Sequence, residues 1–329
     1  MKAIVCQEIG PPSALQYGNM PDPKPGKGEV LIAARACGVN FPDTLIIQGR
    51  YQFKPGLPFA PGSEVAGEVV EVGEGVEAIQ PGDRVMSLVI HGAFAEYVVA
   101  RAATVVPIPE GLDFAGAAAF PMAFGTSMYA LQQRGALQKG ETLLVLGAAG
   151  GVGLAAVQIG KALGARVIAA ASSVEKLALC GEHGADEGVN YTDDTPLKDQ
   201  VKALTDGRGA DVIYDAVGGD AFDQALSAIN WNGRLLVVGF ASGTIPKAAA
   251  NRILLKGASV VGVFWGRFSQ VEPQENMANF AQLARWYAEG RIRPLVTRTY
   301  PLQDAAQALD ALLARTATGK LVLEVTGDS

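Results

Sequence analysis

A strand, a glycine-rich turn, a helix and a second strand follow one another between residues 142 and 171, and this order strongly constrains the fold. Thr142–Leu146 is a short apolar run with the length and composition of a buried parallel strand. Leu154–Leu163 has a helical pattern that Gly164 stops, and Arg166–Ala171 is a second buried strand. Such a βαβ unit predicts a doubly wound α/β sheet.

The turn of this unit is suited to a phosphate-bearing cofactor. Glycine lets the backbone bend tightly and approach a pyrophosphate, and the first N–H groups of the following helix can point at phosphate oxygens. The order of elements therefore predicts a dinucleotide-binding turn, with an empty tight turn as the alternative. The expected contacts are Gly147, Ala148, Ala149, Gly150, Gly151, Val152 and Gly153.

The end of the second strand indicates which dinucleotide is bound. Dinucleotide sites usually have an acidic residue there that holds the ribose hydroxyls. In this chain Ser172 and Ser173 follow the strand, and Lys176 comes one turn later. Hydroxyls and an ammonium attract a 2′-phosphate that a carboxylate would repel, so we expect NADP(H). Alternatively, the two serines only cap a helix that begins near Val174.

Charge and composition exclude several classes of partner. A net charge of −6 without any run of Lys or Arg argues against nucleic acid and anionic membranes. No apolar stretch reaches the roughly 18 residues that span a bilayer, and the N-terminus does not have the pattern of a signal peptide. The 3 cysteines lie far apart and fit neither a disulfide framework nor a cysteine-rich zinc lobe. We expect a cytoplasmic protein.

A change of pattern near residue 120 predicts two domains. Residues 1–122 are rich in Gly, Pro and short strands, which is typical of a compact, mostly antiparallel β domain. Residues 123–292 alternate strands with helices and predict a doubly wound parallel sheet of six strands in the order 3-2-1-4-5-6. Residues 293–329 have strand, helix and strand patterns like those of the first domain, and we expect them to return to it.

Five short segments carry a resemblance that covers nearly the whole chain: GVNFPD at 38–43, PGSEVAG at 61–67, GDRV at 82–85, AAGGVG at 148–153 and GKLV at 319–322. With these segments the chain resembles the zinc-independent quinone oxidoreductase branch of the medium-chain dehydrogenase/reductase superfamily. The resemblance implies a GroES-like catalytic domain built from residues 1–122 and 293–329, and a Rossmann domain that binds NADP(H).

The resemblance also shows where the chain departs from the zinc alcohol dehydrogenases of the superfamily. Those enzymes have zinc ligands (Cys, His and Cys) at or close to the positions of Asn40, Ser63 and Met122. Amide, hydroxyl and thioether groups do not reproduce such a site, so we expect no metal. Glu64, which remains, should bond the backbone or an Arg.

The absence of a Lewis acid favours an activated substrate. Hydride transfer to a quinone or an enone needs only positioning and hydrogen-bond donors to the developing oxyanion. The resemblance puts Asn40 and Tyr51 in the cleft, and we choose them as these donors. Alternatively, Asn40 caps the helix that starts at Phe41, and Tyr51 is plain hydrophobic cover.

Four further residues are expected near the cofactor, because ligands bind beyond the carboxyl ends of such strands. By resemblance Tyr191 lies near the adenosine phosphate, and Phe240 and Phe264 flank the nicotinamide half. Thr126 is a candidate to bond the nicotinamide amide or a phosphate. As alternatives, Tyr191 caps its strand and the two phenylalanines belong to the core.

The leading prediction is therefore an NADPH-dependent, metal-free reductase of quinones or other α,β-unsaturated carbonyls. A first alternative is an enoyl-thioester or haloacrylate reductase that uses the same hydride chemistry. A second is a catalytically silent NADPH-binding protein with a structural role.

The segment Ala258–Trp265 predicts how the chain assembles. It is an apolar strand without Pro or charge and would be the last strand of the parallel sheet. An open edge of this kind invites aggregation, whereas pairing with the same strand of a second copy satisfies both edges. We therefore expect a homodimer, as the resemblance also implies. Alternatively, the helix predicted at Ala278–Glu289 covers the edge.

Overall fold

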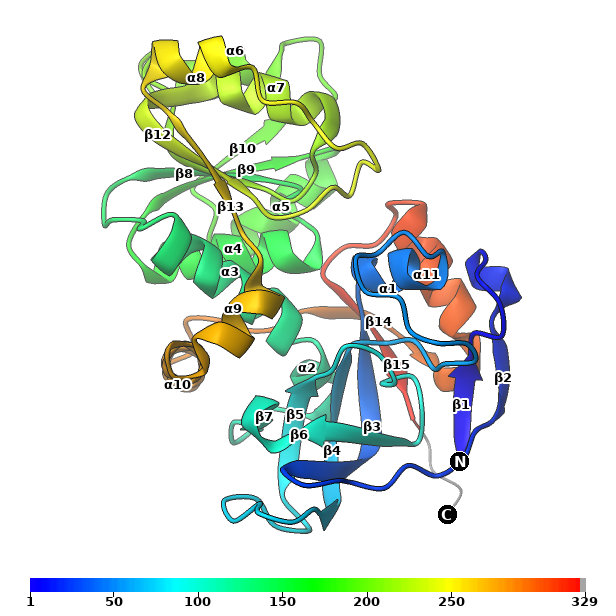
Figure 1. Ribbon diagram of the computed structural model, residues 1–329. Coiled ribbons are helices and arrows are strands. Elements are labelled where there is room, and N and C mark those ends of the chain that lie inside the picture. Colours follow the sequence, from blue (N-terminus) through cyan, green and yellow to red (C-terminus); the bar gives the residue numbers. More distant parts are fainter. Residues whose placement is uncertain (326–329) are drawn as a thin grey trace. The chain divides into compact units, whose positions relative to one another are not determined.

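The structure is a computed structural model that describes residues 1–325, and the chain divides into two compact units (Figure 1). One unit holds Met1–Met122 and the chain from Pro294 onward, and the other holds Ala123–Arg293. The chain therefore returns to the first unit after Arg293, one residue later than the sequence predicts. The first unit has a mostly antiparallel sheet and the second a parallel one, so the predicted fold class is confirmed. None of the helices within residues 1–325 is long and apolar enough to cross a bilayer.

The first unit is built around β3 (Glu29–Val39). This strand pairs antiparallel with β4 (Glu64–Val72), β6 (Tyr97–Arg101) and β15 (Lys320–Glu324). The C-terminal end of the chain therefore supplies a strand of the seven-stranded sheet, as the sequence predicts. The other elements are β1 (Lys2–Val5), β2 (Gln16–Asn19), α1 (Phe41–Ile47), β5 (Arg84–Leu88), β7 (Val105–Pro107), α2 (Phe114–Ala118), β14 (Val296–Pro301) and α11 (Ala305–Leu313).

The second unit contains the predicted parallel sheet. Its strands follow the order β10-β9-β8-β11-β12-β13, which is the expected order 3-2-1-4-5-6. The strands are β8 (Thr142–Leu146), β9 (Arg166–Ala171), β10 (Glu187–Asn190), β11 (Ala210–Asp215), β12 (Ile229–Val237) and β13 (Ser259–Gly262). The α-helices are α3 (Thr126–Met128), α4 (Gly151–Ala162), α5 (Val174–Glu182), α6 (Leu197–Leu204), α7 (Gly219–Ala228), α8 (Ala250–Lys256), α9 (Trp265–Val271) and α10 (Pro273–Ala288), and π-helical turns at Pro121–Gly125 and Tyr129–Arg134 flank α3.

All five residues of β8 are buried. Successive side chains of a strand point to opposite sides of the sheet, so both faces of β8 are covered. Leu144 belongs to a core that includes residues of α6 and α7. Leu143 faces α4, where a Cβ on Gly160 would stand 2.6 Å from the Leu143 Cδ2. The glycine therefore lets the helix lie close to the sheet, as a doubly wound fold requires.

The last strand is shorter than predicted. β13 ends at Gly262, and Trp265, expected within the strand, instead begins α9 and is buried. The Trp265 indole packs against Gly125, where a Cβ would stand 2.4 Å from the ring, and its Nε1–H donates to Asn276 Oδ1 at 2.8 Å. These contacts turn the chain away from the sheet after four residues of strand.

Candidate active site

The glycine-rich turn lies between β8 and α4, as predicted. Gly147 has φ +65°, and a Cβ on Gly153 would stand 2.2 Å from the Gly147 carbonyl oxygen. Both positions therefore require glycine, because the turn folds back onto the first turn of the helix. The first N–H groups of a helix have no acceptor within it, so those at the start of α4 are available to an anion.

Four predicted residues follow strands of the parallel sheet and share its carboxyl edge. Ser172 follows β9, Tyr191 follows β10, Phe240 comes after β12 and Phe264 after β13. Phe264 is 54% exposed, so the alternative of a core residue does not describe it. Tyr191 and Phe240 are half-buried, and Tyr191 packs against the core of the unit. The glycine-rich turn follows β8 and lies at the same edge.

Ser172, Ser173 and Lys176 divide into two roles. The Lys176 Nζ donates to Ser172 Oγ at 3.1 Å, which brings an ammonium and a hydroxyl together at the end of β9. The Ser173 Oγ accepts the Lys176 N–H at 3.3 Å and so caps α5. The capping alternative therefore describes Ser173, whereas Ser172 and Lys176 form a small cationic pair suited to a phosphate oxygen.

A chain of hydroxyl groups beside Thr126 ties the glycine-rich turn to the sheet. Thr126 begins α3, and the next residue, Ser127, donates from Oγ to the Val152 carbonyl oxygen at 2.9 Å. The Tyr214 hydroxyl lies 3.0 Å from the same Oγ. Because the carbonyl can only accept, Ser127 donates to it and Tyr214 donates to Ser127. The sequence reasoning missed both residues, although a tyrosine inside a buried strand calls for a hydrogen-bond partner.

The first unit holds a group of five buried polar side chains, which we call the Lys320 cluster: Asn40, Asp43, Ser63, Glu64 and Lys320. Each of them is at most 7% exposed. Strand register brings them together, because β3 pairs Gly38 with Glu64 on one side and Val39 with Leu321 on the other. These residues lie in segments that carry the family resemblance, but the sequence predicts no role for Asp43 or Lys320.

Lys320 is the centre of this cluster. Its Nζ donates to Asn40 Oδ1 at 2.6 Å, to Glu64 Oε2 at 2.8 Å and to the Val39 carbonyl oxygen at 3.3 Å. A lysine has three donors, so each of them has an acceptor. Glu64 also accepts the Met122 N–H at 2.7 Å. The expectation that Glu64 bonds the backbone is right, but its cationic partner is a lysine and not an arginine.

Asn40 is the N-cap residue of α1 and forms a capping box with Asp43, as the capping alternative expects. Asp43 accepts the Asn40 backbone N–H at 2.8 Å and the Ser63 Oγ–H at 3.0 Å. The Asn40 amide also donates from Nδ2 to Glu64 Oε2 at 2.9 Å. Burial raises the pKa of the Asp43 carboxyl to about 7, although these hydrogen bonds and Lys320 oppose the rise.

Tyr51 is half-buried and packs against the apolar core of the first unit. Burial raises the pKa of its phenol, and the nearby Asp43 carboxylate raises it further. This packing agrees with the apolar-cover alternative. Two residues on, Phe53 stacks on His91 with their centroids 5.9 Å apart.

Residues 26–110 match the family described as the alcohol dehydrogenase GroES-like domain, and residues 151–284 match the one described as zinc-binding dehydrogenase. A "Quinone oxidoreductase-like protein 2 homolog" from Nematostella vectensis is 41% identical over 98% of this chain and 88% of its own length. A Pseudomonas aeruginosa "Quinone oxidoreductase" is 37% identical over 98% and 99%.

Solved structures agree with these matches. The crystal structure of Escherichia coli quinone oxidoreductase complexed with NADPH superimposes with a TM-score of 0.91 at 31% identity, and the match covers 98% of this chain and all of that one. Fold, family matches and relatives thus point to the same group of oxidoreductases. The chain belongs to the quinone oxidoreductase branch of the medium-chain dehydrogenase/reductase superfamily.

Proposed function

We propose that this protein is an NADPH-dependent, metal-free reductase of quinones or other α,β-unsaturated carbonyls. The observation that carries the proposal is the carboxyl edge of the parallel sheet, where the glycine-rich turn and the Ser172–Lys176 pair lie together with aromatic side chains. Relatives named quinone oxidoreductase, one of them complexed with NADPH, support the same activity.

The residues at this edge fit NADP(H). The close approach of Gly153 to Gly147 leaves room for a pyrophosphate at the N-terminus of α4. Ser172 and Lys176 provide a hydroxyl and an ammonium for a 2′-phosphate. Phe240 and Phe264 supply flat apolar surface for the nicotinamide half, and Thr126 a polar group. When bound, the cofactor supplies a hydride.

Two residues of the first unit are proposed to bind the substrate oxygen. Asn40 offers an amide N–H and Tyr51 a phenol O–H, and either donor stabilises negative charge that develops on a quinone or enone oxygen. Asn40, Ser63 and Met122 offer no thiolate or imidazole, so we infer that turnover needs no zinc. An activated acceptor suits such a site, because conjugation spreads the charge onto oxygen.

NADPH oxidation with a panel of quinones, enones and enoyl thioesters tests the proposal, alongside a direct measurement of NADPH binding. Turnover with quinones or simple enones supports it, and turnover only with enoyl thioesters or haloacrylates favours the first alternative. Tight NADPH binding without any turnover would instead indicate a structural role. Exhaustive dialysis against a chelator should leave the rate unchanged, and stoichiometric zinc in the purified protein would contradict the metal-free proposal.

We also propose that the protein acts in the cytoplasm as a homodimer joined through β13. Within residues 1–325, β13 pairs on one side only, with β12. Leu254 and Leu255 of the preceding helix α8 are 79% and 75% exposed, which adds apolar surface for a partner. Light scattering should give about twice the 34.2 kDa chain mass. The variant Val261→Pro should give a monomer, and a monomeric parent protein would contradict the proposal.

A further inference from the structure

Lys320 is unusual for its surroundings. It is 6% exposed and begins a strand whose next three residues, Leu321, Val322 and Leu323, are also buried. Removing an ammonium from water is costly, and an apolar replacement of a buried ion pair is often no less stable. Stability alone therefore does not explain a lysine at this position. We look for a role of Lys320 in the contacts that it makes.

Its contacts fix the orientation of the Asn40 amide. An amide has an accepting end and a donating end, which differ little in shape. Lys320 can only donate and an ionised Glu64 can only accept, so the amide oxygen must face Lys320 and the amide nitrogen must face Glu64. The flipped amide would place donor against donor and acceptor against acceptor. The two charged residues therefore select one of two orientations.

One N–H of Asn40 remains loosely held in this arrangement. The first N–H donates to Glu64 Oε2 at 2.9 Å, whereas the nitrogen lies 3.3 Å from the Gly38 carbonyl oxygen, longer than the usual hydrogen bond. A substrate oxygen can compete for a donor in such a long contact more easily than for one in a short contact. The amide oxygen, by contrast, is held by Lys320 at 2.6 Å.

We propose that Lys320 and Glu64 are positioning residues for Asn40: they hold its amide so that an N–H, and not the carbonyl, is presented to the substrate oxygen. The inference rests on the proposed function, because it takes Asn40 as a donor to that oxygen. Lys320 itself has its three donors engaged by Val39, Asn40 and Glu64. A reversed Asn40 amide would set an oxygen lone pair against the developing oxyanion and slow the reaction.

A matched pair of double variants tests this role: Glu64→Gln with Lys320→Met, and Glu64→Gln with Lys320→Gln. Both remove both charges, and Met and Gln have side chains of equal length, so the two variants differ in the amide at position 320, which offers Asn40 Oδ1 an N–H donor that Met lacks. We expect similar thermal unfolding temperatures and similar KM values for NADPH in the two. The Met variant should have a kcat about tenfold lower, the size of one lost hydrogen bond in the transition state.

The same pair in an Asn40→Ala background provides the control. Without the amide, the Met and Gln variants should have equal kcat values, because there is nothing left to orient. Equal kcat values with Asn40 present would overturn the inference, and so would a difference that persists without Asn40. A parent protein that oxidises NADPH with none of the acceptors would overturn the proposed function itself, which is a separate outcome.

Discussion

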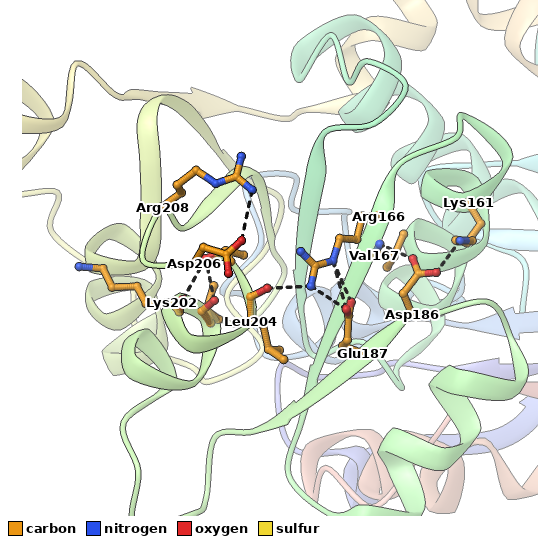
Figure 2. A network of polar contacts seen from close by, with 11 residues as sticks. Lys161, Arg166, Val167, Asp186, Glu187, Lys202, Leu204, Asp206 and Arg208 are labelled. Atoms are coloured by element: carbon orange, nitrogen blue, oxygen red, sulfur yellow. Dashed lines mark hydrogen bonds and ion pairs between the residues drawn. The ribbon is translucent and has the colours of Figure 1, made fainter.

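Two groups of charged residues, one in each unit, use the same kind of contact in different surroundings. In the second unit Arg166 and Glu187 begin β9 and β10, so their ion pair joins the amino ends of neighbouring strands (Figure 2). Their side chains are 36% and 29% exposed, whereas those of Lys320 and Glu64 are 6% and 0% exposed. Water screens the first ion pair and is excluded from the second. The two pairs should therefore differ in their contribution to the free energy of unfolding and in their role.

The exposed network holds strands together and lies away from the candidate cofactor site. Arg166 also donates from Nη2 to the Leu204 carbonyl oxygen at 2.7 Å, and Asp186 links Lys161 with the Val167 N–H (Figure 2). All these residues lie near the amino edge of the sheet, opposite to the edge where the cofactor residues follow their strands. Ligands bind at the carboxyl edge of such sheets, so we assign this network a structural role.

The largest expected effect is the loss of one partner from the buried pair. Lys320→Met leaves the Glu64 carboxylate buried without its counter-ion, which should lower the free energy of unfolding by about 3–5 kcal/mol. Arg166→Met at the exposed pair should cost about 1 kcal/mol or less. Urea titrations of the two variants measure the difference. Equal losses would show that burial does not separate the two pairs.

Two carboxyl groups should give opposite pH dependences. Burial raises the folded-state pKa of Asp43 to about 7, above the value of 3.8 that an aspartate has in the unfolded chain. Between these values the folded chain keeps a proton that the unfolded chain releases, so raising the pH from 4 to 7 should reduce stability, by on the order of 2–4 kcal/mol. Asp43→Asn should remove this decline, since Ser63 can reorient to accept from the new amide.

Asp186 in the exposed network should have the opposite effect on stability, which should rise with pH. Partial burial raises the pKa of its carboxyl, but the hydrogen bonds from Lys161 and Val167 outweigh it and the pKa is lowered. The contribution of Asp186 to the free energy of unfolding is fully present above its unfolded-state pKa, and it is lost as the pH falls through its folded-state pKa. Unfolding free energies of Asp43→Asn and Asp186→Asn, measured from pH 3 to 8, should therefore diverge in opposite senses from the parent protein. Parallel curves would contradict the contrast.

The next smaller effect is on cofactor preference, and it should distinguish the basic residues at the two ends of β9. Arg166 at the amino end is paired with a carboxylate, whereas Lys176 beyond the carboxyl end donates to the hydroxyl of Ser172. NADPH should bind at least about tenfold more tightly than NADH, or roughly 1.4 kcal/mol. Lys176→Ala should lose this preference and Arg166→Ala should keep it. Titration with both cofactors checks this, and equal dissociation constants in the parent protein would contradict it.

The sequence predicted the parallel sheet because each element has its own local pattern of apolar residues, glycines and caps, and the strand order is the one expected of that fold class. The Lys320 cluster could not be found in that way. Lys320 lies 280 positions from Asn40 and 256 from Glu64, and only the register of β15 and β4 on β3 brings them together. The end of β13 was missed for the same reason, because Trp265 packs against Gly125, which lies far earlier in the chain.

The smallest expected effect concerns a buried contact without charge. Tyr214 is fully buried and donates to Ser127, which in turn donates to the Val152 carbonyl in the first turn of α4. Tyr214→Phe removes one neutral hydrogen bond, worth about 1 kcal/mol, but leaves the contact between Ser127 and the turn. The NADPH dissociation constant should therefore rise only about two- to threefold. Ser127→Ala breaks the contact with the turn itself and should weaken NADPH binding more than Tyr214→Phe does. Isothermal titration of both variants with NADPH measures these changes. An unchanged dissociation constant in Ser127→Ala would show that the two hydroxyls stabilise the sheet and do not affect cofactor binding.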